Sequence, residues 1–358
     1  MVSTMASYKF LILRLSAVGD VIRTLPAVKA LKDRFPYSQI IWITEEASQR
    51  FLESQPGIDE VILFPRKRWV RGIKSIRGIW RTLQEMVHFI SGLRKQRFDA
   101  VLDFHGILKS GVLSYLSGTS KRIGFDRRSS REGNFLFSNV KVSLPAERIS
   151  RFERNFYLLR GMGLEIEGFH PGLHIPHEDR EYIDSFFRKL PFAPVKPLIA
   201  IHPGSSPKTA YKRWMPEQYS KLADSLAREM GASVLFTWGP AELKWIEGIR
   251  KGMKELSILA PRTETLTQLG EILRRCDLYV GGDTGPLHIA SLVGTPAVVI
   301  YGPTDAVVNE PLGRHVKIQK DVGCNPCRNR DCKKLSCLEA ITVNDVMNGV
   351  REILSKSG

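Results

Sequence analysis

The sequence has little that would suit an exported or membrane-spanning protein. The apolar run near the N-terminus, Phe10 to Leu13, is short and is followed by Arg14, so it does not predict a secretory signal. No stretch is long and apolar enough to predict a transmembrane helix. Only five cysteines occur in 358 residues, and their spacing is not that of a secreted disulfide framework. These absences favour a soluble cytoplasmic protein that is at most peripheral to a membrane.

Acidic residues are also scarce relative to basic ones. The chain has 53 Lys and Arg against 37 Asp and Glu, a formal net charge of +16. Such a surface favours anionic partners: nucleic acid, an anionic membrane face or phosphorylated substrates. A length of 358 residues favours two domains, and a hydrophobic content of 43% is enough for a core in each.

The first predicted strand-to-helix turn lacks the G-x-G-x-x-G pattern. An apolar run over 10–15 predicts a buried parallel strand, and apolar residues at helical spacing over 21–31 predict the next helix. The missing glycines argue against a nicotinamide or flavin site at this turn. Asp20 ends the turn, where it could cap the helix or belong to a ligand site. Open α/β sheets bind ligands at the carboxyl ends of their strands, so the position favours a site.

Strand and helix patterns alternate in both halves of the chain. Further strands are expected at 39–44, 61–64, 98–104, 198–201, 233–237, 278–280 and 297–301, and helices at 47–54, 147–162, 178–190, 217–230, 242–252, 265–275 and 343–354. This alternation predicts an α/β fold of two doubly wound domains. Residues 165–195 are rich in Gly, Pro and His, and the domains are placed at 1–180 and 181–358. The last helix, about 343–355, is a candidate to pack back on the N-terminal domain.

A second glycine turn lies in the segment 278–290. An apolar strand leads into Gly281-Gly282-Asp283-Thr284-Gly285-Pro286, and His288 falls in the first turn of the following helix. Asp283 or Thr284 could cap this helix, and a proline suits its first turn. A helix that starts in this way directs unpaired N–H groups and a partial positive charge at an anion, most naturally a phosphate. The alternative is an ordinary strand-to-helix turn.

The segment Arg66 to Arg97 is unusually basic, with ten basic residues and one acid, Glu85. Its apolar residues recur every three or four positions, which predicts one long amphipathic helix. This helix could simply pack on the core with a solvated face, or it could face a membrane or a phosphorylated lipid. No nucleic-acid-binding motif accompanies it. Residues 121–131 form a second basic cluster, expected on a loop.

Four of the five cysteines crowd one short basic stretch, with the pattern Cys324-x2-Cys327-x4-Cys332-x4-Cys337. Tetrahedral zinc is chemically possible there. The spacing is not the usual pair of C-x-x-C motifs, and neighbouring Lys and Arg would stabilise thiolates without metal, so reduced thiols or a labile disulfide are the alternatives. Cys276, at a predicted helix end, is expected in the core.

Several separate motifs resemble glycosyltransferase family 9, the ADP-heptose:lipopolysaccharide heptosyltransferases. The opening Leu13-Arg14-Leu15-Ser16-Ala17-Val18-Gly19-Asp20-Val21, followed by Leu25-Pro26-Ala27, resembles the N-terminal motif of the family. The segment Gly282–Gly285 with His288, then Gly294-Thr295-Pro296 and Tyr301–Thr304, resembles its donor-domain signature. His202-Pro203-Gly204, Lys212-x-Trp214 and the Trp238-Gly239 turn also match. The resemblance runs from about residue 9 to 350.

The resemblance implies the GT-B architecture: two facing Rossmann-like domains, with the acceptor on the N-terminal one and the nucleotide sugar on the C-terminal one. It also implies inversion at the anomeric carbon without a D-x-D metal site. Asp20 corresponds to the general base and Lys212 to the lysine near the donor phosphate. The donor-binding positions carried over are Ser205, Ser206, Glu242, Asp283, Thr284, Gly285 and His288.

The family's acceptors carry Kdo carboxylates and phosphates, with which arginine pairs well. The acceptor-binding candidates are Arg66, Arg68, Arg71, Arg122, Arg127, Arg128 and Arg131. The resemblance thus implies heptose transfer from ADP-heptose to the Kdo/heptose inner core of lipopolysaccharide, at the cytoplasmic face of the inner membrane. ADP-heptose would be a substrate, and no cofactor, resident metal or nucleic-acid partner is expected. The alternative is a relative of the same fold that uses another nucleotide sugar or surface-glycan acceptor.

Overall fold

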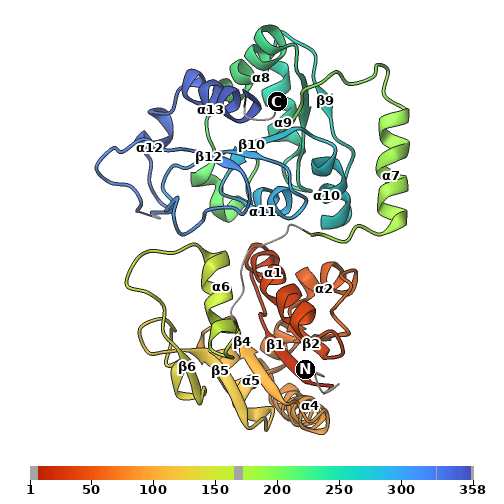
Figure 1. Cartoon of the computed structure of the whole chain (residues 1–358), viewed down its shortest axis with the longest axis vertical. Coiled ribbons are helices and arrows are strands. Elements are labelled where there is room, and N and C mark those ends of the chain that lie inside the picture. The colour runs from red at the N-terminus through yellow and green to blue at the C-terminus, as the bar shows by residue number, and fades with distance from the viewer. Residues whose placement is uncertain (1–6, 165–171, 328, 356–358) are drawn as a thin grey trace, which may run out of the picture. The chain divides into compact units, whose positions relative to one another are not determined.

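The chain divides into two compact units, Met1–His170 and Pro171–Gly358. The structure, a computed structural model, describes residues 7–164, 172–327 and 329–355. Each unit is built on one parallel sheet of six strands with helices packed around it (Figure 1). The units divide about ten residues before the expected boundary at 180/181, which falls inside helix α7 (His177–Arg188). That helix packs on α10 (Leu266–Arg274) of the second unit.

The first sheet has the strand order β3-β2-β1-β4-β5-β6. Its strands are β1 (Lys9–Leu13), β2 (Gln39–Thr44), β3 (Glu60–Leu63), β4 (Ala100–Asp103), β5 (Lys121–Phe125) and β6 (Val140–Val142). Its helices are α1 (Val18–Arg34), α2 (Glu46–Glu53), α3 (Arg66–Gly72), α4 (Ile76–Lys95), α5 (Leu108–Leu116) and α6 (Arg151–Arg160), with a 3-10 turn η1 (Asn134–Leu136).

The second sheet has the order β12-β11-β10-β7-β8-β9. Its strands are β7 (Leu198–His202), β8 (Ser233–Phe236), β9 (Ile258–Leu259), β10 (Leu278–Gly282), β11 (Ala297–Ile300) and β12 (His315–Ile318). Besides α7 and α10, this unit contains η2 (Pro207–Lys212), α8 (Pro216–Met230), α9 (Leu243–Lys251), α11 (Gly285–Leu292), α12 (Ser336–Glu339) and α13 (Val343–Ser355).

Both sheets share one topology. Counted from its own first strand, each unit has the order 3-2-1-4-5-6, which is that of a dinucleotide-binding Rossmann sheet. In this order, the second and third strands lie on one side of the first strand, and the fourth to sixth strands lie on its other side. Ligands bind at the switch point between the first and fourth strands, outside their carboxyl ends. The switch point lies between β1 and β4 in the first unit and between β7 and β10 in the second. The predicted α/β, doubly wound class is confirmed.

Continuous apolar runs produce these buried strands. Leu11, Ile12 and Leu13 of β1 are fully buried because helices cover both faces of a parallel sheet. In the second unit, the Trp214 ring meets Tyr219 edge-on at 5.1 Å, and its indole N–H donates to the Ile341 carbonyl at 3.1 Å. This bond ties the chain after β7 to the C-terminal part of the same unit.

The basic segment 66–97 is two helices, so the prediction of one long helix was wrong. α3 ends at Gly72, and α4 begins after Ser75, whose hydroxyl accepts a hydrogen bond from the Gly78 amide at 3.2 Å. A serine cap of this kind starts a new helix, since it satisfies an N–H that has no partner in the preceding turn. The two helices pack on each other, with the Trp69 ring edge-on to Phe89 at 5.6 Å.

One further expectation differs from the structure. Residues 121–125 were expected on a loop but form β5, because Ile123, Gly124 and Phe125 are buried against β4 and β6. The last helix, α13, packs on β11, β12 and α8 of its own unit. Its apolar side, including Val346, Val350 and Ile353, belongs to the core of that unit. The short strands β6, β9 and β12 were not predicted.

Candidate active site

Asp20 lies in the first turn of α1, directly after the carboxyl end of β1. It does not cap the helix, because the N-cap position is Ala17. Three guanidinium groups surround its carboxylate. Arg14 Nη2 lies 2.7 Å from Oδ2, while Arg23 Nη1 and Arg151 Nη1 lie 3.0 Å and 2.8 Å from Oδ1. Both carboxylate oxygens therefore carry a charge-assisted hydrogen bond.

The arginines dominate the ionisation of Asp20. Burial by itself would raise the pKa of this carboxyl, but attraction by Arg14, Arg151 and Arg23 outweighs burial and holds the pKa well below its usual value. Asp20 is therefore ionised throughout the neutral range and can accept a proton. One of its oxygens must, however, exchange an arginine for the group that gives up the proton. Arg151 is the most exposed of the three, at 34% of its side chain against 12% for Arg14 and 8% for Arg23.

The end of β4 completes this edge of the first sheet. Asp103 is fully buried, and it accepts hydrogen bonds from the Asn134 side chain at 2.7 Å and from the amides of His105 and Gly106. His105 Nδ1 accepts from the Leu15 amide at 3.2 Å. Burial, together with the charges of Arg14 and Lys109, lowers the pKa of His105 to about 3, so this imidazole is neutral. These bonds fix the two strand ends on either side of the switch point.

In the second unit, His202 ends β7 and contacts two polar groups. Its Nδ1 lies 3.0 Å from the Thr237 hydroxyl, and its Nε2 lies 3.5 Å from Glu242 Oε2. Glu242 is buried and also accepts from the Gly239 amide at 2.7 Å. A Cβ at Gly204 would lie 2.2 Å from Glu242 Oε2, so a side chain there would displace the Glu242 carboxylate from this position. The predicted ribose-binding carboxylate is thus held in a fixed position at this edge of the sheet.

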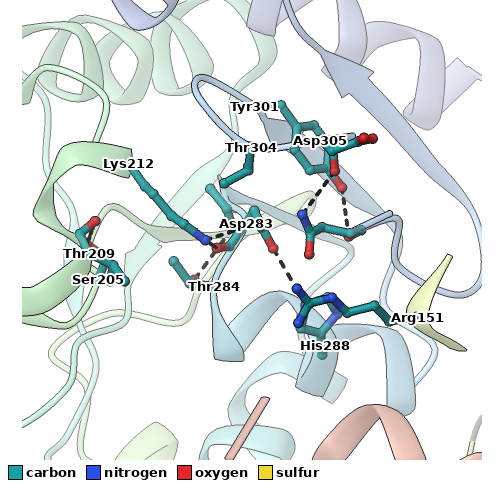
Figure 2. Close-up of polar contacts among 12 residues, drawn as sticks. Arg151, Ser205, Thr209, Lys212, Asp283, Thr284, His288, Tyr301, Thr304 and Asp305 are labelled. Carbon is teal, nitrogen blue, oxygen red and sulfur yellow. Dashed lines mark hydrogen bonds and ion pairs between the residues drawn. The ribbon is translucent and has the colours of Figure 1, made fainter. Parts of the chain in front are cut away.

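Lys212 and Asp283 come together across the second switch point. Lys212 Nζ lies 3.1 Å from Asp283 Oδ2 and 3.3 Å from the Asp283 carbonyl oxygen. Figure 2 shows the lysine side chain extended toward this aspartate, with Thr284 beside it. His288 Nε2 lies 3.8 Å from Asp283 Oδ1. The sequence prediction placed these residues in one site, and the structure brings them within reach of one another.

Helix α11 begins beside this pair. Thr284 is its N-cap, and its side chain makes no capping hydrogen bond. A Cβ on Gly285 would meet nothing within 4 Å, so the space beside this residue is open. No acidic residue occupies the first turn of the helix. A helix N-terminus with open N–H groups next to a lysine can stabilise a phosphate.

The two serines after β7 differ. Ser205 is buried; its hydroxyl donates to the Thr209 carbonyl at 3.0 Å and accepts from Arg213 Nε at 3.2 Å. Ser206 is exposed, and its hydroxyl lies 2.9 Å from that of Thr209. Ser205 therefore shapes the loop in this structure, whereas the Ser206 hydroxyl can reach a ligand by giving up a single local contact.

The acceptor candidates occupy three settings. Arg66 and Arg68 pair with Glu45 and Glu85 at 3.7 Å and 2.8 Å. Arg122 donates to the carbonyls of Phe137 and Thr119, both at 2.8 Å, so its guanidinium stabilises the sheet edge. The remaining candidates, Arg71, Arg127, Arg128 and Arg131, are exposed. The last of these sits on the loop after β5, where its amide bonds the Gly106 carbonyl beside the end of β4.

All five cysteines are free thiols. Among the described residues, no three His, Cys, Asp or Glu side chains are grouped closely enough to hold a metal ion. Burial and the neighbouring Cys324, Cys327 and Cys332 raise the pKa of the Cys337 thiol. Cys276 is buried as expected, and burial raises its pKa to about 12. In the described residues, the four-cysteine stretch therefore shows no arrangement of ligands for zinc.

Sequence reasoning missed the partners of Asp20. Arg14 and Arg23 stand within or next to the N-terminal motif, so a search for cations around a buried carboxylate could have found them. Arg151 lies 131 residues away, and it reaches Asp20 because α6 packs on α1. The Asn155 side chain donates to the Arg23 carbonyl at 2.9 Å in that contact. No local signal in the sequence shows this contact.

Two Rossmann-type units in one chain, each with polar side chains at its switch point, have the architecture of the GT-B fold. Comparison with known proteins gives the family. The sequence model of glycosyltransferase family 9 (heptosyltransferase) matches residues 86–337, and the chain belongs to that family.

Relatives that match most of the chain are also named heptosyltransferases. The chain is 28% identical to the lipopolysaccharide core heptosyltransferase OpsX of Haemophilus influenzae over 302 residues, which cover 83% of this chain and 80% of OpsX. It is also 28% identical to lipopolysaccharide heptosyltransferase 1 of Pseudomonas aeruginosa over 331 residues, or 90% and 87% of the two chains.

Solved structures show the same fold. The glycosyltransferase family 9 protein of Veillonella parvula superposes with a TM-score of 0.77 at 23% identity and covers 99% of both chains. The Escherichia coli heptosyltransferase WaaC with ADP has a TM-score of 0.73 at 22% identity and covers 96% of this chain and 99% of WaaC.

Proposed function

We propose that this chain transfers heptose from ADP-heptose to the Kdo/heptose inner core of lipopolysaccharide. The observation that carries the proposal is an ionised aspartate at the carboxyl end of β1 in a chain of family 9. Relatives named lipopolysaccharide heptosyltransferases cover most of its length. The solved structure of the Escherichia coli heptosyltransferase WaaC with ADP-2-deoxy-2-fluoro heptose supports ADP-heptose as the donor.

The proposed reaction is a single displacement with inversion. The oxygen of an acceptor hydroxyl attacks the anomeric carbon of the donor sugar as the bond from that carbon to the diphosphate oxygen breaks. The hydroxyl proton passes to the Asp20 carboxylate, and ADP leaves with the electron pair of the broken bond. A positioned base of this kind contributes about 10²–10⁴-fold to the rate.

The second unit would hold the donor. Glu242 would bind the adenosine ribose, and Asp283 would contact the sugar. Lys212 and the first turn of α11 would stabilise the charge that grows on the departing diphosphate. The Lys212–Asp283 ion pair is partly buried, so the lysine is already oriented toward this end of the sheet before a donor binds.

The acceptor half of the proposal rests on charge. Arg71, Arg127, Arg128 and Arg131 are exposed and can meet Kdo carboxylates and phosphates. Because such an acceptor is anchored by lipid, the enzyme would work as a peripheral protein at the cytoplasmic face of the inner membrane. We expect neither a cofactor nor a nucleic-acid partner, and the chemistry described needs no metal ion.

The direct test is a mass-spectrometric transfer assay. Purified protein is incubated with ADP-heptose and either Kdo2-lipid A or its heptosylated product. A gain of one heptose on either acceptor supports the proposal and identifies the step. No transfer to either acceptor contradicts it. Transfer from a different nucleotide sugar, such as ADP-glucose, at a higher kcat/KM than from ADP-heptose would favour the alternative donor.

A further inference from the structure

Helices α3 and α4 carry apolar side chains on two sides. One side packs on the first unit: Trp69 is buried, and Leu93 belongs to the core together with Phe89. The other side is in solvent, where Trp80 is 69% exposed and Val87 is 70% exposed. Four more large apolar side chains are exposed on the same two helices or the link between them: Val70, Ile73, Ile79 and Leu83.

These exposed side chains form a stripe and are not scattered singly. Trp80, Leu83 and Val87 have the spacing i, i+3, i+7, which places them on one face of α4. The core-facing residues Phe89 and Leu93 lie on the opposite face, so packing within the unit does not explain the stripe. A contiguous exposed apolar surface on a folded chain marks a place of interaction.

The segment that carries the stripe is rich in cations. Residues 66–97 carry a net charge of +9, more than half of the +16 of the whole chain. Their one acid, Glu85, is offset by Arg68 at 2.8 Å and Arg81 at 3.5 Å. Within the described part of the chain, Arg71, Lys74 and Arg77 form no ion pair.

A tryptophan, aliphatic side chains and cations on the same two helices together fit one kind of partner surface. An anionic bilayer offers phosphates to the cations and an interfacial apolar layer to the tryptophan and aliphatic groups. Nucleic acid would satisfy the cations but leave Leu83 and Val87 in water. In the described residues, no helix is both long and apolar enough to cross a membrane.

We infer that this outer face of α3 and α4, formed by Val70, Ile73, Lys74, Arg77, Ile79, Trp80, Leu83 and Val87, docks the chain on an anionic phospholipid bilayer. The inference deepens the proposed function and rests on it only for the identity of the lipid-borne acceptor. α3 begins at the carboxyl edge of the first sheet, where Arg66 pairs with Glu45 and the Glu45 amide bonds the Leu15 carbonyl. Docking through this face would bring a bilayer to the edge of the unit that carries Asp20.

The test is co-sedimentation of the full chain with vesicles of phosphatidylglycerol and phosphatidylethanolamine. The wild type should bind these vesicles, should bind pure phosphatidylcholine vesicles much less, and should lose affinity as salt rises. Trp80→Glu with Val87→Glu should reduce binding by at least about tenfold, because each substitution places an anion in the apolar stripe. Lys74→Gln with Arg77→Gln should reduce it by about fivefold per charge.

The matched control is Leu256→Glu, which alters an apolar side chain that is 82% exposed in the second unit and should leave vesicle binding unchanged. Transfer to a deacylated, water-soluble acceptor should be equal in the wild type and in Trp80→Glu/Val87→Glu. Equal vesicle binding by that variant and the wild type would overturn the inference. So would tighter binding of duplex RNA than of vesicles, or a dimer that the substitutions dissociate. Loss of docking with normal transfer to the soluble acceptor separates this inference from the proposed function.

Discussion

The two units present their carboxylates in opposite ways. Asp20 in the first unit is paired with Arg14, Arg23 and Arg151, whereas Asp283 in the second unit is paired with Lys212 at the start of α11. The topology of the two sheets is the same, so the difference lies in the side chains at the switch point. The first arrangement keeps a base ionised. The second keeps a cation and N–H groups available to an incoming diphosphate.

Removing the carboxylate of the first unit should have the largest effect. We expect Asp20→Asn to slow heptose transfer by about 10²–10⁴-fold, because the amide cannot take the acceptor proton. The rate is measured by mass spectrometry at saturating ADP-heptose. Asp33→Asn on the same helix is the control, since Asp33 is exposed and pairs with Lys29, away from the arginines around Asp20. Near-normal transfer by a folded Asp20→Asn protein would disprove the role of the base.

Removing the cation of the second unit should follow in size. We expect Lys212→Gln to lower kcat by about 10²–10³-fold, since a group that stabilises the leaving diphosphate is lost. Lys208→Gln, on the same 3-10 turn, should be close to wild type because Lys208 is exposed. If both variants lose activity equally, the effect is one of general surface charge, and the assignment of Lys212 to the leaving group fails.

Removing one of the three arginines around Asp20 should change the pH dependence of transfer more than its maximal rate. Arg151→Gln removes one of the cations that lower the pKa of Asp20, so that pKa should rise. The acidic limb of the kcat/KM profile should therefore move to higher pH. Arg160→Gln, on the same helix but away from Asp20, is the control. An unchanged acidic limb in Arg151→Gln would show that this arginine does not control the pKa of Asp20.

The three arginines around Asp20 also affect the stability of the fold at acidic pH. The pKa of Asp20 is lower in the folded chain than in the unfolded chain, so its interactions stabilise the fold fully above the ordinary aspartate pKa of about 4. This contribution is lost as the pH falls from there toward the depressed pKa of the folded chain. Acid unfolding of Arg151→Gln should begin at a higher pH than that of the wild type, as monitored by circular dichroism.

Two glycines of the second unit give the smallest and most local test. Gly204→Ala would place a Cβ 2.2 Å from Glu242 Oε2, so Glu242 must move and ADP affinity should fall. Gly248 is exposed on α9, and a Cβ there would meet nothing within 4 Å, so Gly248→Ala should stabilise the fold by about 0.5–1 kcal/mol without changing ADP affinity. Calorimetric titration of ADP into both variants checks this, and normal affinity in Gly204→Ala would contradict the placement of Glu242.

The sequence was sufficient for the repeating architecture and for the motif-borne residues. Apolar strands such as 10–13 and 39–44 are read directly from their composition, because both faces of a parallel sheet are buried. Asp283 directly follows β10, while Asp20, Lys212 and Glu242 lie on the segments that follow β1, β7 and β8. Their roles in binding and catalysis stay predictions until the variants above are measured.

Other features depend on contacts that no local pattern contains. Arg151 reaches Asp20 only through the packing of α6 on α1, and Arg122 turns inward because carbonyls of the neighbouring segments accept its hydrogen bonds. The break between α3 and α4 was visible in principle, as Ser75 between two glycines, but the apolar periodicity continues across it. The short strands β9 and β12 pair with β8 and β11. Their own sequences carry little strand signal, so these strands depend on that pairing and could not be predicted.

The division of labour between the units is tested most directly by titrating ADP into Asp20→Asn and Lys212→Gln and comparing each with the wild type by calorimetry. Asp20→Asn should bind ADP with the affinity of the wild type, because its carboxylate serves the acceptor. Lys212→Gln should bind ADP more weakly, because the diphosphate loses a cation. Loss of ADP binding in Asp20→Asn, together with wild-type binding in Lys212→Gln, would contradict the account.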